Sequence, residues 1–65
     1  MYTLQTHREL IDGNWYYFLY ASHRWHLYAW IDGAMVKIKG NIDNLTKCKE
    51  IAYKFADLRK ETENG

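Results

Sequence analysis

The sequence predicts an α+β fold: a four-stranded antiparallel meander followed by one C-terminal helix that covers one face of the sheet (ββββα). The first observation is two Ile-Asp-Gly segments, 11–13 and 31–33, which lie between β-rich runs and are typical of hairpin turns. The second is the last third of the chain, where apolar residues recur at helical intervals. With 65 residues the chain forms one domain, expected over residues 1–62, and residues 63–65 are expected to fray.

Four strands are expected, at about residues 2–10, 15–21, 24–31 and 34–40. Asp-Gly tolerates positive φ at both positions, so a two-residue turn at 32–33 fixes the register of the last two strands. The link between the second and third strands is a tight turn around Ser22 and His23. The pairs expected in the last hairpin include Ile31–Ala34, Trp30–Met35, Ala29–Val36, Tyr28–Lys37, Leu27–Ile38 and His26–Lys39.

The first hairpin admits two registers. A three-residue loop over 11–13 puts Leu4 and Leu10 on the same face as the other aliphatic residues. A two-residue turn would instead turn His7 and Glu9 toward the core, which is unfavourable for polar groups. We therefore expect the three-residue loop.

The helix is expected to begin after Asp43 or Asn44, both good N-caps, and to end near Lys60. Its apolar residues cover an arc of about 160°, a broad stripe suited to packing on a sheet. Cys48 lies on this stripe and is expected in the core. The stripe comprises Leu45, Cys48, Ile51, Ala52, Phe55 and Leu58.

The strands carry more aromatic residues than one core can hold. Segment 14–30 contains eight of the chain's eleven Phe, Trp and Tyr residues. Period-two alternation separates an aliphatic face from a mixed aromatic face, and a single helix can cover only one of them. The mixed face, left facing water, is expected to hold Trp15, Tyr17, Leu19, His26, Tyr28, Trp30, Met35, Lys37 and Lys39.

Composition argues against several classes of function. An autonomous nucleic-acid binder usually carries a clear positive excess and a nucleic-acid mimic is strongly acidic, whereas this chain has a formal net charge of +1. One cysteine excludes a disulfide framework or a Cys-rich zinc site, and the three histidines lack metal-ligand spacing. We expect no enzyme activity, cofactor or metal. No signal peptide or membrane span is apparent, and a cytoplasmic location is expected.

The uncovered aromatic face therefore predicts a non-catalytic binding protein. Tyr, Trp and Met are enriched in protein interfaces, so a protein partner is expected, with lysines at the rim. The small size suggests a phage or mobile-element regulator or inhibitor of host machinery. Two alternatives use the same face: a homodimer, and a nucleic-acid-binding module that stacks bases on the rings. A third interpretation is purely structural, since aromatic residues have high β-propensity and can line a solvated sheet. The predicted binding residues are Trp15, Tyr17, His26, Tyr28, Trp30, Met35, Lys37 and Lys39.

Segment 24–58, RWHLYAWIDGAMVKIKGNIDNLTKCKEIAYKFADL, resembles the small DNA-binding module of AP2-type factors and phage-integrase N-terminal domains. Those modules have a three-stranded sheet, a Gly-x-aromatic-Asp-Thr link and an Ala-rich helix. The resemblance implies the same sheet-and-helix architecture. It does not extend to DNA binding, because those modules present arginine-rich strands where this chain presents Trp, Tyr and Met. The matching residues are Gly40, Asp43, Ala52 and Ala56, with Ile42 in place of the aromatic and Asn44 in place of the threonine.

Overall fold

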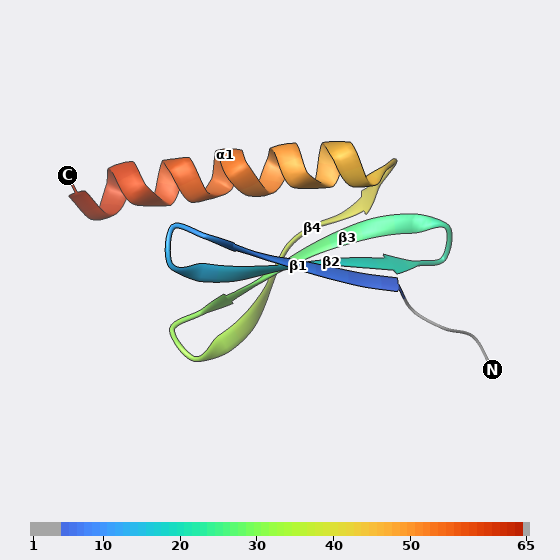
Figure 1. The fold of residues 1–65 in the computed structure, drawn as a ribbon, viewed down its shortest axis with the longest axis horizontal. Helices are drawn as coiled ribbons and strands as arrows, with labels where there is room; N and C mark the ends of the chain where they lie inside the picture. The colour runs from blue at the N-terminus through green and yellow to red at the C-terminus, as the bar shows by residue number, and fades with distance from the viewer. Residues whose placement is uncertain (1–4, 65) are drawn as a thin grey trace.

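The computed structural model describes residues 5–64 and confirms the predicted architecture (Figure 1). Strands β1 (Gln5–Ile11), β2 (Asn14–Ala21), β3 (Arg24–Ile31) and β4 (Ala34–Ile42) form one antiparallel sheet in chain order. Helix α1 (Leu45–Asn64) packs on β2, β3 and β4. The predicted start of the first strand, including Leu4, lies outside the described residues. The helix continues past its predicted end near Lys60, and fraying of the last residues stays a prediction.

All three hairpins close with two-residue turns in which both residues have positive φ. The turns are Asp12-Gly13 (50° and 84°), Ser22-His23 (53° and 62°) and Asp32-Gly33 (51° and 78°). These angles are those of type I′ turns, whose twist matches that of the flanking strands. The Ser22-His23 turn has neither the Asn or Asp nor the Gly that such turns favour, so it holds two side chains in a strained region.

We expect His23→Gly to raise the free energy of unfolding by about 1 kcal/mol, because glycine removes the steric cost of positive φ at that position. Urea denaturation would measure the change as a higher midpoint with an unchanged slope. Gly33→Ala is the matched control. Gly33 has a similar φ of 78°, so this variant should lose a comparable free energy of unfolding. A decrease in stability for His23→Gly would show that the imidazole makes a contact worth more than the strain.

The prediction for the first hairpin was wrong. Ile11 pairs with Asn14 and Glu9 with Tyr16, which is the register of a two-residue turn. Leu10 is therefore on the face away from α1 and is 55% exposed. Glu9 is on the α1 side, where its carboxylate accepts a hydrogen bond from the Tyr53 hydroxyl. The expected burial cost does not arise, because β1 is an edge strand and Glu9 is only partly buried and has a partner.

The register of β3 and β4 is confirmed near the turn and wrong farther along. Ile31–Ala34, Trp30–Met35, Ala29–Val36 and Tyr28–Lys37 pair as predicted. Leu27 then pairs with Lys39 and Trp25 with Ile42, so β4 contains extra residues at two bulges. Lys39 consequently does not lie opposite His26. Asn41, with φ of 58°, lies in the second irregular stretch.

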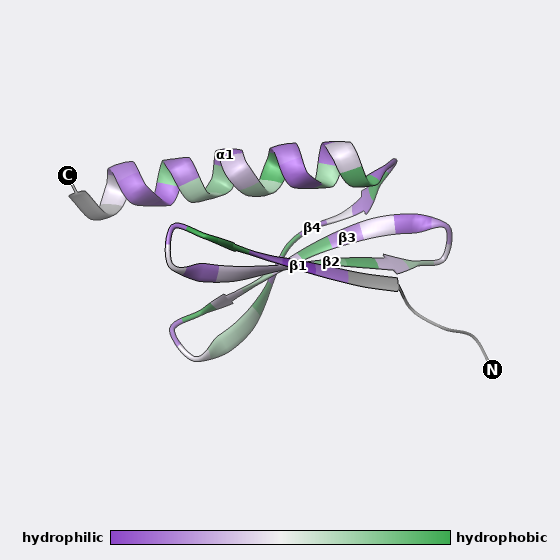
Figure 2. Ribbon diagram, viewed as in Figure 1, coloured by the Kyte–Doolittle hydropathy of each residue, from purple (hydrophilic) through white to green (hydrophobic). Residues whose placement is uncertain are grey.

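The core lies between α1 and the opposing sheet face. Tyr16, Phe18, Leu27 and Ala29 from the strands are at most 1% exposed, and Cys48 is fully buried as predicted. The buried helix residues are Cys48, Ala52 and Ala56. Two of these three are alanines, which let the helix backbone approach the sheet closely. Hydrophobic and hydrophilic residues alternate along α1, as expected of an amphipathic helix (Figure 2).

Helix α1 begins where predicted. The Asn44 side chain accepts a hydrogen bond from the Lys47 backbone at 2.8 Å, so Asn44 is the N-cap. Asp43, the alternative cap, forms ion pairs with Arg24 and, at 3.5 Å, with Lys47. Arg24 at the start of β3 is thereby joined to the start of α1.

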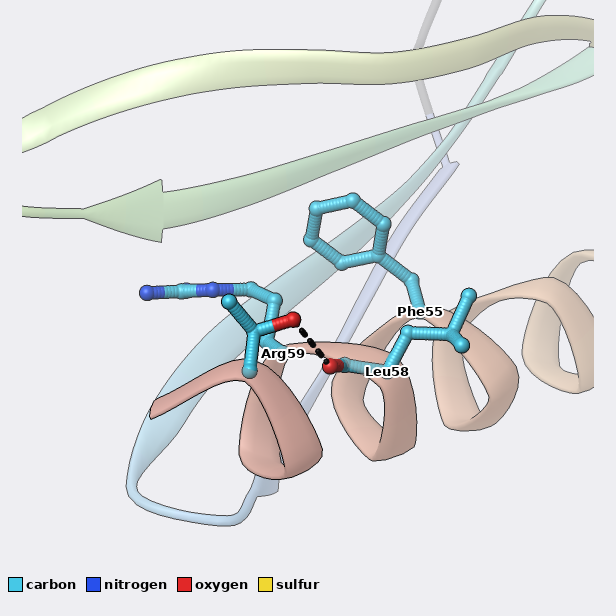
Figure 3. A pocket seen from close by; sticks show the side chains of 4 residues that line it. Phe55, Leu58 and Arg59 are labelled. Atoms are coloured by element: carbon cyan, nitrogen blue, oxygen red, sulfur yellow. Dashed lines mark hydrogen bonds between the residues drawn. The ribbon is translucent and has the colours of Figure 1, made fainter. Parts of the chain in front are cut away.

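The far end of the helix is less well covered than expected. Leu58, predicted on the buried stripe, is 54% exposed. The sheet twists so that the β3–β4 turn diverges from α1 (Figure 1). A shallow hollow of about 350 Å³ results, lined by Phe55, Leu58, Arg59 and Thr62 (Figure 3). Phe55 points toward the strands there, and its ring meets that of Tyr16 edge-on at 6.4 Å.

Candidate functional site

The sheet face opposite α1, here called the open face, carries the predicted aromatic residues. Trp15, Trp30 and Met35 are 38%, 46% and 47% exposed. Tyr17, Tyr28 and Leu19 are half-buried, because neighbouring side chains on the sheet cover their flanks. The open face consists of Arg8, Leu10, Trp15, Tyr17, Leu19, His26, Tyr28, Trp30, Met35 and Lys37.

The strand register arranges these side chains in rows that run across the sheet. Arg8 pairs with Tyr17, Tyr17 with Tyr28, and Tyr28 with Lys37, so one row has a cation at each end and two tyrosines between. Cross-strand partners on one face lie about 4.5–5.5 Å apart at Cβ, close enough for the rings to touch. In the next row Leu10 pairs with Trp15, and Trp30 pairs with Met35.

A shallow hollow of about 240 Å³ lies at the centre of the open face. Tyr17, Leu19, Tyr28 and Met35 line it, and three of these were among the predicted binding residues. The hollow lies between the predicted anchors and matches the size of one large apolar side chain or a few small ones. A partner that fills it removes apolar surface from water, which is the main source of favourable binding free energy.

Charge on the open face has one sign. The Arg8 guanidinium lies 4.8 Å from the centre of the Trp15 ring, a cation–π contact. Lys37 is exposed at the opposite edge. Among residues 5–64, the sheet positions of the open face include no Asp or Glu. The carboxylates lie at the hairpin tips (Asp12, Asp32), at the start of α1 (Asp43), on the opposite face of edge strand β1 (Glu9) and on α1 itself.

His26 is held in place instead of being free at a rim. Its Nε2 atom lies 3.2 Å from the Ala21 carbonyl oxygen, and because a carbonyl only accepts, Nε2 is the donor. Nδ1 is buried, and within the described residues no hydrogen-bond partner reaches it. A Cβ at Gly40 would lie 3.0 Å from Nδ1 and 2.9 Å from Lys37 Cε. A side chain at position 40 would therefore require the flexible end of Lys37 and the His26 ring to shift.

Lys39, a predicted binding residue, and Arg24 do not add charge to the open face. Lys39 is exposed, but the bulge pairs it with Leu27 and Gly40 takes its expected place beside His26. Arg24 is bound to Asp43. The positive charge of the open face therefore comes from Arg8 and Lys37.

Arg8 and Leu10 are the two open-face residues that the sequence reasoning missed. The signal was present: segments 11–13 and 31–33 are identical, and the same Ile-Asp-Gly sequence forms the same two-residue turn in both hairpins. Applying the second turn to the first would have placed both residues on the open face.

The site offers no evident metal-binding geometry. Within residues 5–64, no group of three or more His, Cys, Asp and Glu side chains is placed to hold a metal ion. In the same part of the chain, no helix combines the length and hydrophobicity of a membrane span.

Comparison with protein-family models, with curated proteins and with solved structures finds no significant match to this chain. The resemblance to the AP2 and integrase modules therefore stays a prediction, and the functional argument depends on the open face itself.

Proposed function

We propose that this protein is a non-catalytic binding protein and that its open face docks a protein partner. The observation that supports this most directly is the apolar hollow between Tyr17, Leu19, Tyr28 and Met35, flanked by the exposed rings of Trp15 and Trp30. Aromatic anchors beside a small apolar pocket are typical of the energetic centre of a protein interface. Arg8 and Lys37 would lie at its rim. A regulator or inhibitor of phage or mobile-element origin, acting on a larger host machine, is the role that we infer from the small size.

A homodimer through the same face is less favourable. In a two-fold symmetric dimer the same patch meets itself. Each copy would bring Arg8 and Lys37 and no carboxylate to the interface, so like charges would be placed together without compensation.

Nucleic acid is the second candidate, because the open face combines exposed aromatic rings with positive charge only. Bases stack on such rings, and cations neutralise phosphates. Two cations give little electrostatic attraction at physiological salt, however, and Leu10, Leu19 and Met35 offer no flat surface for stacking. A protein partner uses all of these residues.

The test is capture of a partner on the immobilised protein from a nuclease-treated lysate. Tyr28→Ala/Trp30→Ala should lose at least nine-tenths of the captured partner, because it removes two central anchors. Leu58→Ala is the matched control: Leu58 is a large apolar side chain at least as exposed as Trp30 but lies on α1, and capture should be unchanged. Equal recovery by wild type and the double variant would move the binding site off the open face.

A further inference from the structure

We propose that the partner element is an amphipathic helix with acidic residues on both sides of its apolar stripe, lying along the strands between Arg8 and Lys37. This inference depends on the proposed function and adds the chemical class of the ligand. Its starting point is the row formed by Arg8, Tyr17, Tyr28 and Lys37, in which the two cations stand on the two edge strands.

The width of the open face suits a helix. Arg8 and Lys37 are separated by three strand spacings, or about 14 Å. A helix with its side chains is about 10–12 Å across, so it fits between the two cations and can place an acidic residue beside each. An extended strand is too narrow to contact both. The twisted sheet already accepts a helix on its other face, where α1 packs on β2, β3 and β4.

The charge of the open face selects the charge of the helix. The face carries Arg8 and Lys37 and, in the described part of the chain, no carboxylate. Acidic flanks would find a cation at both edges, whereas basic flanks would meet like charge at Arg8 and Lys37. Arg8 is held over Trp15 in advance, which reduces the entropy lost when a carboxylate binds it.

The apolar hollow on the open face favours a partner helix with an apolar stripe. Tyr17, Leu19, Tyr28 and Met35 form a shallow depression of about 240 Å³ that spans β2, β3 and β4. Leucine or methionine side chains at i, i+3, i+4 and i+7 of a helix would project into it, the usual pattern of a helix bound in a groove. Addition of a strand at the β4 edge is disfavoured, because β4 carries two bulges and the lysines at positions 37 and 39.

The experiment uses three probes of defined chemistry against the whole protein, with Trp fluorescence as the readout. The first is an Ala-based peptide of about 18 residues, long enough to form a helix, with a Leu stripe flanked by Glu. The second has Lys in place of each Glu, and the third is a single-stranded oligothymidine. We expect the Glu peptide to bind at least tenfold more tightly than either of the others.

Charge reversal provides the matched control. In Arg8→Glu/Lys37→Glu the preference should invert, so that the Lys peptide binds more tightly, because both residues are exposed and their replacement leaves the hollow intact. In Tyr28→Ala/Trp30→Ala both peptides should lose affinity. Equal affinity of the wild type for the two peptides, or no inversion in the charge-reversed variant, would overturn the acidic-helix proposal, and tighter binding of oligothymidine would replace it with a nucleic-acid ligand. If the double alanine variant still loses the partner captured from lysate, the proposed function survives such a result.

Discussion

The Phe18→Ala variant is expected to be largely unfolded at room temperature. Phe18 is fully buried at the centre of β2, on the face that α1 covers. Removing a buried phenylalanine costs about 3–5 kcal/mol, from lost burial and from the cavity left behind. A single core in a domain of this size rarely supplies more than about 3–5 kcal/mol of stability, so the substitution removes most or all of it. The loss would be visible as a missing cooperative transition in urea and a collapse of amide dispersion in NMR spectra.

The neighbouring residue supplies the control. Tyr17 is adjacent in β2 but points to the open face, where it is half-buried. Tyr17→Ala should cost less than half as much stability, since the ring loses mainly cross-strand contacts with Tyr28. It should nevertheless weaken partner binding. Equal destabilisation by the two variants would mean that both sheet faces contribute equally to stability. That result would contradict the proposal that the open face is a binding surface.

The fold was predictable because two different periodicities divide the chain. Alternation through residues 15–38 and the helical stripe that begins at Leu45 require different backbones, and two Asp-Gly turns fix where the strands reverse. The Ser22-His23 turn runs against local preference, because both residues adopt positive φ there. The open-face positions of Trp15, Tyr17, Tyr28, Trp30 and Met35 follow directly from this alternation.

The prediction for the first hairpin was wrong because it treated Glu9 as buried, although Glu9 lies on an edge strand and is only partly buried. The rule that polar groups avoid the core applies only where a strand is covered. Helix α1 packs mainly on β2, β3 and β4, and Glu9 on the edge strand accepts a hydrogen bond from the Tyr53 hydroxyl. The twist of the sheet and the crossing angle of the helix decide which strands the helix covers, and neither can be derived from the local sequence pattern.

The bulges in β4 depend on side chains from another strand. Gly40 inside a strand was a weak sign of a bulge or a close backbone approach. Its physical reason is the pair of side chains from His26 and Lys37 that fill the space where a Cβ would stand. Because His26 is on β3, the irregularity could not be derived from the sequence of β4 alone. The bulge moves Lys39 away from the predicted row and leaves Arg8 and Lys37 as the charges of the open face.

Stability should also fall at alkaline pH because of Cys48. Burial raises the pKa of the Cys48 thiol from 9.0 to about 11, since a thiolate in the core would lack water. Above pH 9 the unfolded chain releases this proton while the folded protein keeps it. The unfolded state then binds fewer protons, so the free energy of unfolding decreases as pH rises from 9 to 11. The decrease attributable to Cys48 is on the order of 2 kcal/mol, and none of it is present below pH 9.

Cys48→Ala isolates this contribution, because alanine does not titrate and leaves only a small cavity beside the sheet. Below pH 9 the variant should be less stable than wild type by an amount that does not change with pH, and the difference between the two proteins should shrink or reverse between pH 9 and 11. The pKa of Tyr53 is also raised, by its hydrogen bond to Glu9, but that contribution is common to both proteins and cancels in the difference. Urea denaturation at closely spaced pH values measures both curves. Parallel curves of unfolding free energy against pH for the two proteins would mean that the Cys48 thiolate reaches water without unfolding. Such a result would contradict the tight packing of α1 against the sheet at this position.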